Sequence, residues 1–240
     1  MATSREVPRL ILADDHAMLR EGLRAILKEA GFDVVGEASN GQEAVRLSQT
    51  LAPDVAVLDI SMPLLNGIDA ARQILKSSPA TKILILTMYT DDRYVLASLR
   101  AGISGFMLKS KAASLLVEAI HTVLRGEIFL CSTISRVVAE AYLAQDDTPA
   151  DPLSIRERGV LQLIAEGKSA KEIGGILGVS AKTAESHRTN IMQKLHIHEV
   201  AGLVRYAVRE GLVQDAPQDH SRTPEGPVTQ LRMGLSAKAS

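Results

Sequence analysis

The stretch Val55-Ala-Val-Leu-Asp-Ile-Ser-Met-Pro-Leu-Leu-Asn-Gly67 decides the fold of the first half of this chain. A short aliphatic run stops at a carboxylate, Asp59, and two turn signals, Met-Pro and Asn-Gly, follow before a helix-like stretch begins. This pattern is typical of a buried parallel strand that leads into a helix.

The same pattern occurs at three other places. Polar side chains follow the apolar runs at 10–12, 83–86 and 106–108, and they are Asp14 with Asp15, Thr87 and Lys109. Strand and helix signals alternate through residues 8–125, which predicts five βα units. We expect a flavodoxin-like α/β fold with a parallel sheet of order 2-1-3-4-5. Ligands bind at the carboxyl ends of such strands, so these side chains should share one site.

The chemistry of the predicted site follows from its carboxylates. Asp14, Asp15 and Asp59 would repel one another unless a cation lay between them, and hard oxygen ligands suit Mg²⁺. The Asp59 carboxylate can attack a phosphoryl group and hold it as an aspartyl phosphate. We expect the Ser61 backbone carbonyl to help hold the metal. We expect Lys109 and Thr87 to contact the phosphoryl oxygens, Lys109 through its charge and Thr87 through its hydroxyl.

Each of these residues also has a structural interpretation, because an Asp after a strand usually caps the next helix and a Lys is usually a solvated surface charge. Their joint placement at four strand ends favours a site.

The second half of the chain is helical in pattern. Residues 126–150 read as a linker, helical in part, and residues 214–240 have the composition of a disordered tail. Between them, two capping boxes open helices at Ser154 and Ser169, and a tight turn at 177–180 precedes a helix over 181–195. Residues 151–213 carry 9 basic and 7 acidic side chains, a balance that permits nucleic-acid binding without establishing it.

A helix–turn–helix places its second helix in the major groove of DNA. On that helix we expect base contacts or phosphate contacts from polar side chains near its exposed face. The candidates are Lys182, Thr183, Glu185, Ser186, His187, Arg188, Thr189 and Lys194.

The bulk properties exclude several classes of protein. The net charge is −1, the only cysteine is Cys131, and no apolar run approaches the length of a membrane span. We expect a soluble cytoplasmic protein without an intrachain disulfide and without a membrane partner.

Residues 8–125 resemble a response-regulator receiver domain. The matching segments are Leu-Ala-Asp-Asp-His at 12–16, the stretch 58–67, Leu-Thr-Met at 86–88 and Gly-Phe-Met-Leu-Lys at 105–109. The resemblance implies that a sensor histidine kinase phosphorylates Asp59 in the presence of Mg²⁺. It also implies that Thr87 and the strand-five aromatic, here Phe106 where Tyr is common, then reorient.

Residues 151–213 are similar to the LuxR-type domain of NarL/FixJ response regulators. The matching segments are 153–158, 163–168, 171–173 and Lys-Thr-x-Glu-x-His-Arg-x-Asn-Ile at 182–191. The resemblance implies binding to double-stranded DNA, a homodimer in the active state with RNA polymerase as a further candidate partner, and pairing through the helix over 199–210. It further implies that the unphosphorylated receiver covers the recognition helix.

Three positions depart from that family pattern. Ala184 stands where Val is usual, Gly159 where a bulkier polar residue is common, and Gly174 where Ala is typical. Gly174 and its neighbour Gly175 both lie in one short helix. Glycine is disfavoured in a helix by about 1 kcal/mol relative to alanine. We therefore expect Gly174→Ala together with Ala184→Val to stabilise this half of the chain.

Together these observations predict a phosphorylation-dependent transcriptional regulator of a two-component system that is not an enzyme. A phosphatase of the haloacid dehalogenase type needs an Asp two residues after its nucleophile, where this chain has Ser61, and no Gly-Lys-Ser/Thr phosphate loop is present. Two alternatives stay open. One is a regulator with an idle receiver that protein partners control; the other is an interaction module that has lost DNA binding.

Overall fold

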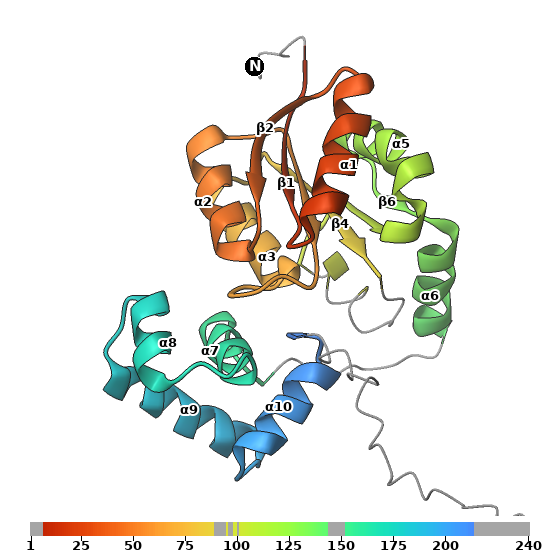
Figure 1. Cartoon of the computed structure of the whole chain (residues 1–240). Helices are drawn as coiled ribbons and strands as arrows, with labels where there is room; N and C mark the ends of the chain where they lie inside the picture. The colour runs from red at the N-terminus through yellow and green to blue at the C-terminus, as the bar shows by residue number, and fades with distance from the viewer. Residues whose placement is uncertain (1–6, 89–94, 96–97, 100, 144–151, 214–240) are drawn as a thin grey trace, which may run out of the picture.

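The structure is a computed structural model that describes residues 7–88, 95, 98–99, 101–143 and 152–213. A first unit, residues 7–143, is an α/β layer structure, and a second unit, residues 152–213, is helical (Figure 1). Among the described helices, none combines the length and the apolar character that a bilayer span requires.

The sheet of the first unit is parallel and has the order β2-β1-β3-β4-β5-β6 within the described residues. The predicted order 2-1-3-4-5 is confirmed, and β6 adds a short edge strand in the segment that the sequence assigned to the linker. The strands are β1 Arg9–Ala13, β2 Asp33–Ala38, β3 Val55–Asp59, β4 Lys82–Thr87, β5 Gly105–Leu108 and β6 Phe129–Leu130.

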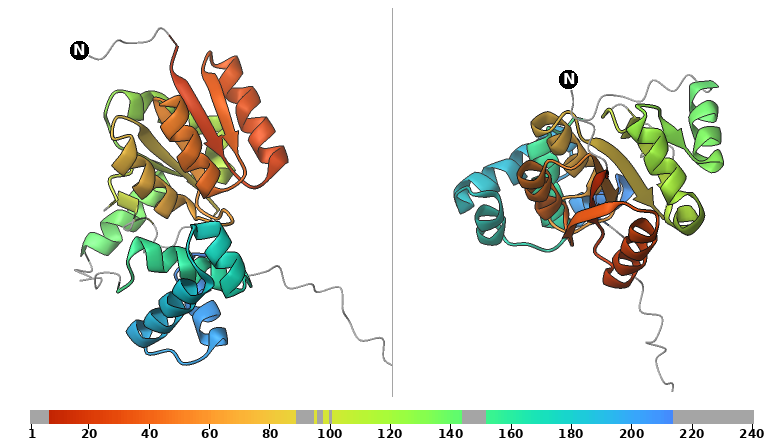
Figure 2. Two further views of the ribbon diagram at one scale, coloured as in Figure 1. Left: turned by 90° about the vertical axis from the view of Figure 1, so that its left-hand side faces the viewer. Right: turned by 90° about the horizontal axis from the view of Figure 1, so that it is seen from above.

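Helices cover both faces of this sheet, as the view along its edge shows (Figure 2). Helix α1 packs with α5 on one face, and α2 packs with α3 on the other. Their bounds are α1 Ala17–Glu29, α2 Gly41–Leu51, α3 Gly67–Ser77 and α5 Ala112–Leu124, and α6 Ser132–Leu143 follows β6. The helix predicted between β4 and β5 falls largely outside the described residues.

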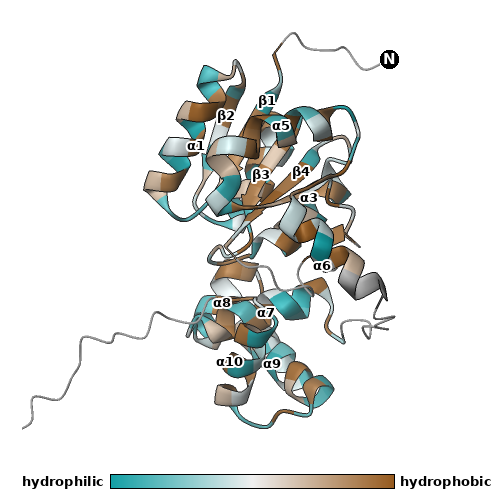
Figure 3. Ribbon diagram, turned by 90° about the vertical axis from the view of Figure 1, so that its right-hand side faces the viewer, coloured by the Kyte–Doolittle hydropathy of each residue, from teal (hydrophilic) through white to brown (hydrophobic). Residues whose placement is uncertain are grey.

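The core of the first unit lies between these layers. Every residue of β3 is buried, and the hydropathy colouring shows apolar strands beneath mixed helices (Figure 3). A strand buried on both faces is expected to be apolar, and Asp59 at the end of β3 is the one residue of the strand that departs from this. Its buried carboxylate therefore needs a partner of opposite charge.

The second unit consists of α7 Ile155–Ala165, α8 Ala170–Leu177, α9 Ala181–Leu195 and α10 Val200–Arg209. Both predicted capping boxes are present, with Ser154 and Ser169 capping α7 and α8. Gly178 ends α8 in a left-handed conformation with φ 66°, which glycine adopts without steric cost. The core of this unit includes Val160, Ile191 and Leu203.

The two units meet where the β3–α3 loop, residues 60–66, faces α7 (Figures 1 and 2). Leu64 of that loop packs against the core of the second unit. Hydrogen bonds of Arg158, Gln162 and the C-cap residue Glu166 of α7 join the second unit to the loop and to α3, and α9 lies on the side away from the sheet (Figure 1). The implied covering of the recognition helix by the first unit is therefore not found here.

Candidate functional site

The carboxyl ends of β1, β3 and β5 bring Asp14, Asp59 and Lys109 together, as predicted. The Lys109 ammonium lies 2.7 Å from Asp14 Oδ2 and 2.9 Å from Asp59 Oδ2. Both carboxylates are about 2% exposed, and the Lys109 side chain is 6% exposed. A buried charge is stable only with a partner of opposite sign, so Lys109 holds the two carboxylates in one place.

The electrostatics of the site oppose an ionised Asp59. Burial raises the pKa of the Asp59 carboxyl, Lys109 lowers it in part, and the neighbouring Asp14 charge raises it again. Burial disfavours the charge of Lys109, but the Asp59 and Asp14 carboxylates outweigh this and raise the pKa of the Lys109 ammonium. An additional cation at this position would therefore be stabilised by the negative charge that the lysine leaves uncompensated.

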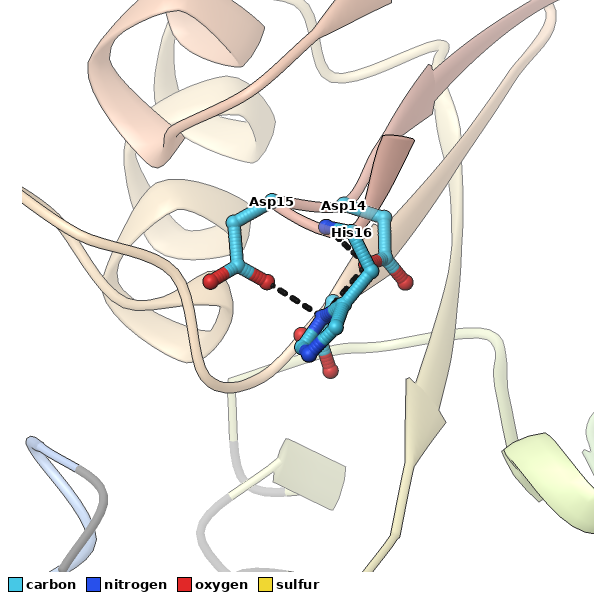
Figure 4. A group of neighbouring side chains, drawn as sticks. Asp14, Asp15 and His16 are labelled. Atoms are coloured by element: carbon cyan, nitrogen blue, oxygen red, sulfur yellow. Dashed lines mark hydrogen bonds and ion pairs between the residues drawn. The ribbon is translucent and has the colours of Figure 1, made fainter. Parts of the chain in front are cut away.

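A second group that faces the carboxylates, His16, was not predicted from the sequence. Its Nδ1 lies 2.8 Å from Asp15 Oδ1 and 3.2 Å from Asp14 Oδ1 (Figure 4). Ligand atoms of Asp14, Asp15, His16 and Asp59 all lie within 4.8 Å of one another. The signal in the sequence is its position directly after Asp14-Asp15, because a residue that follows two carboxylates at a strand end lies at the same site.

Of the remaining predicted residues, Ser61 and Thr87 lie at the same edge of the sheet, whereas Phe106 lies inside β5 opposite Ile85. The Ser61 N–H donates to the Asp59 carboxylate. Thr87 ends β4 and pairs in register with Leu108, the residue before Lys109. Thr87 is 1% exposed and Phe106 is fully buried in β5. A hard-oxygen donor set beside a lysine suits Mg²⁺ and a phosphoryl group.

The candidate DNA-contacting residues lie on α9 and are exposed or half-buried. Arg188 pairs with Glu185 at 2.9 Å, so both remain on one surface. Lys194 pairs with Glu157 of α7 at 2.8 Å, and this hydrogen bond, together with Ser154, lowers the pKa of the Glu157 carboxyl to about 2. Lys194 therefore ties α9 to α7 in this structure. The side chains of Ser186 and Thr189 donate to backbone carbonyls of their own helix.

Two family models match this chain. Residues 10–121 match the response regulator receiver domain, and residues 151–207 match the bacterial regulatory proteins of the luxR family. The fold and the acidic site thus define a response regulator with a receiver domain and a LuxR-type helix–turn–helix domain.

The relatives agree with this class. The oxygen regulatory protein NreC of Staphylococcus carnosus is 39% identical over 214 residues, which cover 85% of this chain and 99% of that protein. The RcsB response regulator of Salmonella typhimurium has a solved structure with 30% identity and a TM-score of 0.54, covering 85% of this chain and 100% of the RcsB chain. A structure of two RcsB dimers bound to two parallel DNAs is 29% identical with a TM-score of 0.53, covering 84% and 98%. This chain belongs to the response regulators with a LuxR-type DNA-binding domain.

Proposed function

We propose that this protein is a transcriptional regulator whose DNA binding depends on phosphorylation of Asp59 by a sensor histidine kinase. The observation that carries the proposal is the buried contact of Lys109 with both Asp14 and Asp59. A lysine in this position can receive phosphoryl oxygens on Asp59 while Asp14 remains its partner.

The transfer needs position and charge more than covalent chemistry from the protein. An Asp59 oxygen bonds to phosphorus while the bond from phosphorus to the donor imidazole nitrogen breaks, and the imidazole keeps that electron pair. Asp14, Asp15, Asp59 and the Ser61 backbone carbonyl would hold Mg²⁺, and the bound ion would offset the negative charge of the phosphoryl oxygens. Lys109 holds the phosphoryl group afterward. Thr87 and Phe106 then reorient, because the Thr87 hydroxyl can hydrogen-bond the phosphoryl oxygens on Asp59.

The LuxR-type domain is the part of the protein that binds DNA in this proposal. We propose that α9 enters the major groove of double-stranded DNA, with the eight α9 candidates named above in base or phosphate contact. The DNA-bound RcsB dimers support a homodimer as the active state.

The buried single cysteine, Cys131, suits the reducing cytoplasm. Transfer to Asp59 ends in signalling rather than in turnover, so the protein is not proposed as an enzyme.

The domain bounds that we propose are 8–125 for the receiver, 126–150 for the linker, 151–213 for the LuxR-type domain and 214–240 for the tail. The pairing of β6 with β5 attaches the start of that linker to the receiver sheet.

The test measures the affinity of the full chain for DNA, with and without acetyl phosphate and Mg²⁺. It compares the wild type with Asp59→Asn. We expect tighter binding after phosphorylation in the wild type only. Binding that ignores both the donor and the substitution would favour the alternative of an idle receiver controlled by protein partners.

A further inference from the structure

Gln162 of α7 forms a bridge between two backbone groups of the receiver. Its Nε2 donates to the Met62 carbonyl at 2.9 Å, and its Oε1 accepts from the Asn66 N–H at 2.9 Å. The Gln162 residue is fully buried although it is polar. Because one side-chain amide satisfies a donor and an acceptor four residues apart, Gln162 fixes the shape of the loop between them.

Glu166, the C-cap residue of α7, extends this contact. Its Oε1 accepts from the Leu64 N–H at 3.0 Å and from Gln162 Nε2 at 2.9 Å. Leu64 has a left-handed backbone with φ 67°, a conformation that costs free energy for a residue with a side chain. The hydrogen bond that the Leu64 N–H donates to Glu166 therefore stabilises the loop at its strained residue.

This loop is part of the phosphorylation site. It starts directly after Asp59, and the Ser61 N–H within it donates to the Asp59 carboxylate. The next residue is Met62, whose carbonyl accepts the hydrogen bond from Gln162. The Met62 N–H donates to the Ile60 carbonyl. The peptide unit that Gln162 contacts is thus separated by a single peptide unit from the one whose N–H touches Asp59.

We propose that Gln162 and Glu166 are positioning residues for the Asp59 site, so that the LuxR-type domain completes the site in the receiver. The inference rests on the proposed function, because it assumes that Asp59 takes phosphate with Mg²⁺. With α7 docked, the loop is already ordered before the metal binds. Without the hydrogen bonds of Gln162, the free-energy cost of ordering the loop opposes metal binding. By linkage, metal and phosphate at Asp59 and docking of α7 then affect each other reciprocally.

The experiment measures metal affinity on the full chain, with Mn²⁺ as the probe. Free Mn²⁺ is followed by electron paramagnetic resonance, and Mg²⁺ is added as competitor. The main variant is Gln162→Met, which keeps the volume and removes both hydrogen bonds to the receiver backbone, together with those to the Asn66 and Glu166 side chains. The matched control is Gln193→Met on the exposed surface of α9. Phosphorylation by acetyl phosphate over a range of Mg²⁺ concentrations gives the second readout.

We expect Gln162→Met to raise the dissociation constants of Mn²⁺ and Mg²⁺ about fivefold, at the lower end of usual coupling between sites, with Gln193→Met unchanged. The phosphorylation rate at saturating Mg²⁺ should stay near that of wild type, because the loop then orders around the metal. Unchanged metal affinity in a folded Gln162→Met protein, or tighter binding, would overturn the proposal.

Glu166 provides variants at a half-buried position, in case Gln162→Met does not fold. Glu166→Ala removes the acceptor for Leu64 and should weaken metal binding, whereas Glu166→Gln keeps an acceptor oxygen and should restore it. If both weaken binding equally, the lost charge rather than the hydrogen bond is responsible, and positioning is refuted. A wild type that binds no metal and takes no phosphate would reject the proposed function itself, whereas normal wild-type behaviour with unaffected variants rejects this inference alone.

Discussion

Asp59 is a buried carboxylate whose ionised form lowers the stability of the fold. Its carboxylate is buried, and burial and Asp14 together raise its pKa above the usual value despite Lys109. A group with a raised folded-state pKa favours folding when protonated, so its ionised form destabilises the protein as the pH rises through that pKa. We predict that Asp59→Asn increases the free energy of unfolding at pH 7 without Mg²⁺, on the order of 1 kcal/mol.

The pH dependence tests the cause of this gain. The advantage of Asp59→Asn should shrink as the pH falls through the raised pKa and vanish below the ordinary value of 3.8, where both proteins are neutral at this position. Thermal unfolding by circular dichroism across this range measures it. The exposed Asp33→Asn serves as control and should show no such gain. Equal stability of wild type and Asp59→Asn at pH 7 would contradict the account.

At the scale of an element, α8 contains two adjacent glycines with opposite surroundings. A Cβ on Gly174 would lie 2.8 Å from the Val179 carbonyl oxygen, a backbone atom that cannot move aside. A Cβ on Gly175 meets nothing within 4 Å. The expectation that Gly174→Ala stabilises the domain is therefore wrong, because the tight turn after α8 folds back onto this position.

We predict that Gly175→Ala increases the free energy of unfolding by about 0.5–1 kcal/mol, and that Gly174→Ala lowers it. The two variants differ only in which of two neighbours gains a methyl group, so each is the control for the other. Urea denaturation of the full chain, followed by the helical signal, measures both. Equal effects of the two substitutions would show that the close approach to Val179 does not matter.

The expectation for Ala184 stays a prediction. A pocket of about 170 Å³, partly open to solvent, borders Ala184 and is lined by Ile164 and Ile173 and also by the charged side chain of Arg188. The extra methyl groups of Ala184→Val therefore have room, and filling such a space is favourable when the new side chain fits.

Elements with strong local signals could be predicted from the sequence. The strands around Asp59 and the capped helices α7 and α8 follow from apolar runs and from Ser-x-x-Glu boxes, which act over a few residues. β6 was missed because two residues, Phe129 and Leu130, carry no periodicity. The convergence of Asp14, Asp59 and Lys109 was predictable because parallel strands end at one edge.

At the scale of the whole molecule, the contact between the two domains was not predictable. Gln162 and Arg158 on a helix are indistinguishable from solvated side chains until the partner surface is known. In the structure Arg158 Nε lies 3.1 Å from Asp69 Oδ2, and Asp69 is fully buried. Such polar contacts depend on two surfaces meeting, which no local pattern encodes.

Leu64 of the β3–α3 loop packs its apolar side chain against the core of the LuxR-type domain, and its substitution gives the last prediction. Leu64→Asn removes the side chain that packs on the LuxR-type core, while asparagine tolerates the left-handed backbone at this position. We therefore expect the receiver to stay folded and the two domains to separate. Spin labels on cysteines at the exposed positions Lys28 and Gln193 report the distance between domains.

The wild type should give one narrow distribution of label distances, and Leu64→Asn a broad one extending to longer distances, because the remaining polar contacts alone bind weakly in water. Ile128→Asn is the control, since Ile128 is an exposed apolar residue, 65% accessible, far along the chain from the contact. A narrow, unchanged distribution in Leu64→Asn would mean that Gln162, Glu166 and Arg158 suffice to hold the domains together. In that case the docked arrangement is secured by directional polar bonds, and a change in the loop after Asp59 would act on those bonds directly.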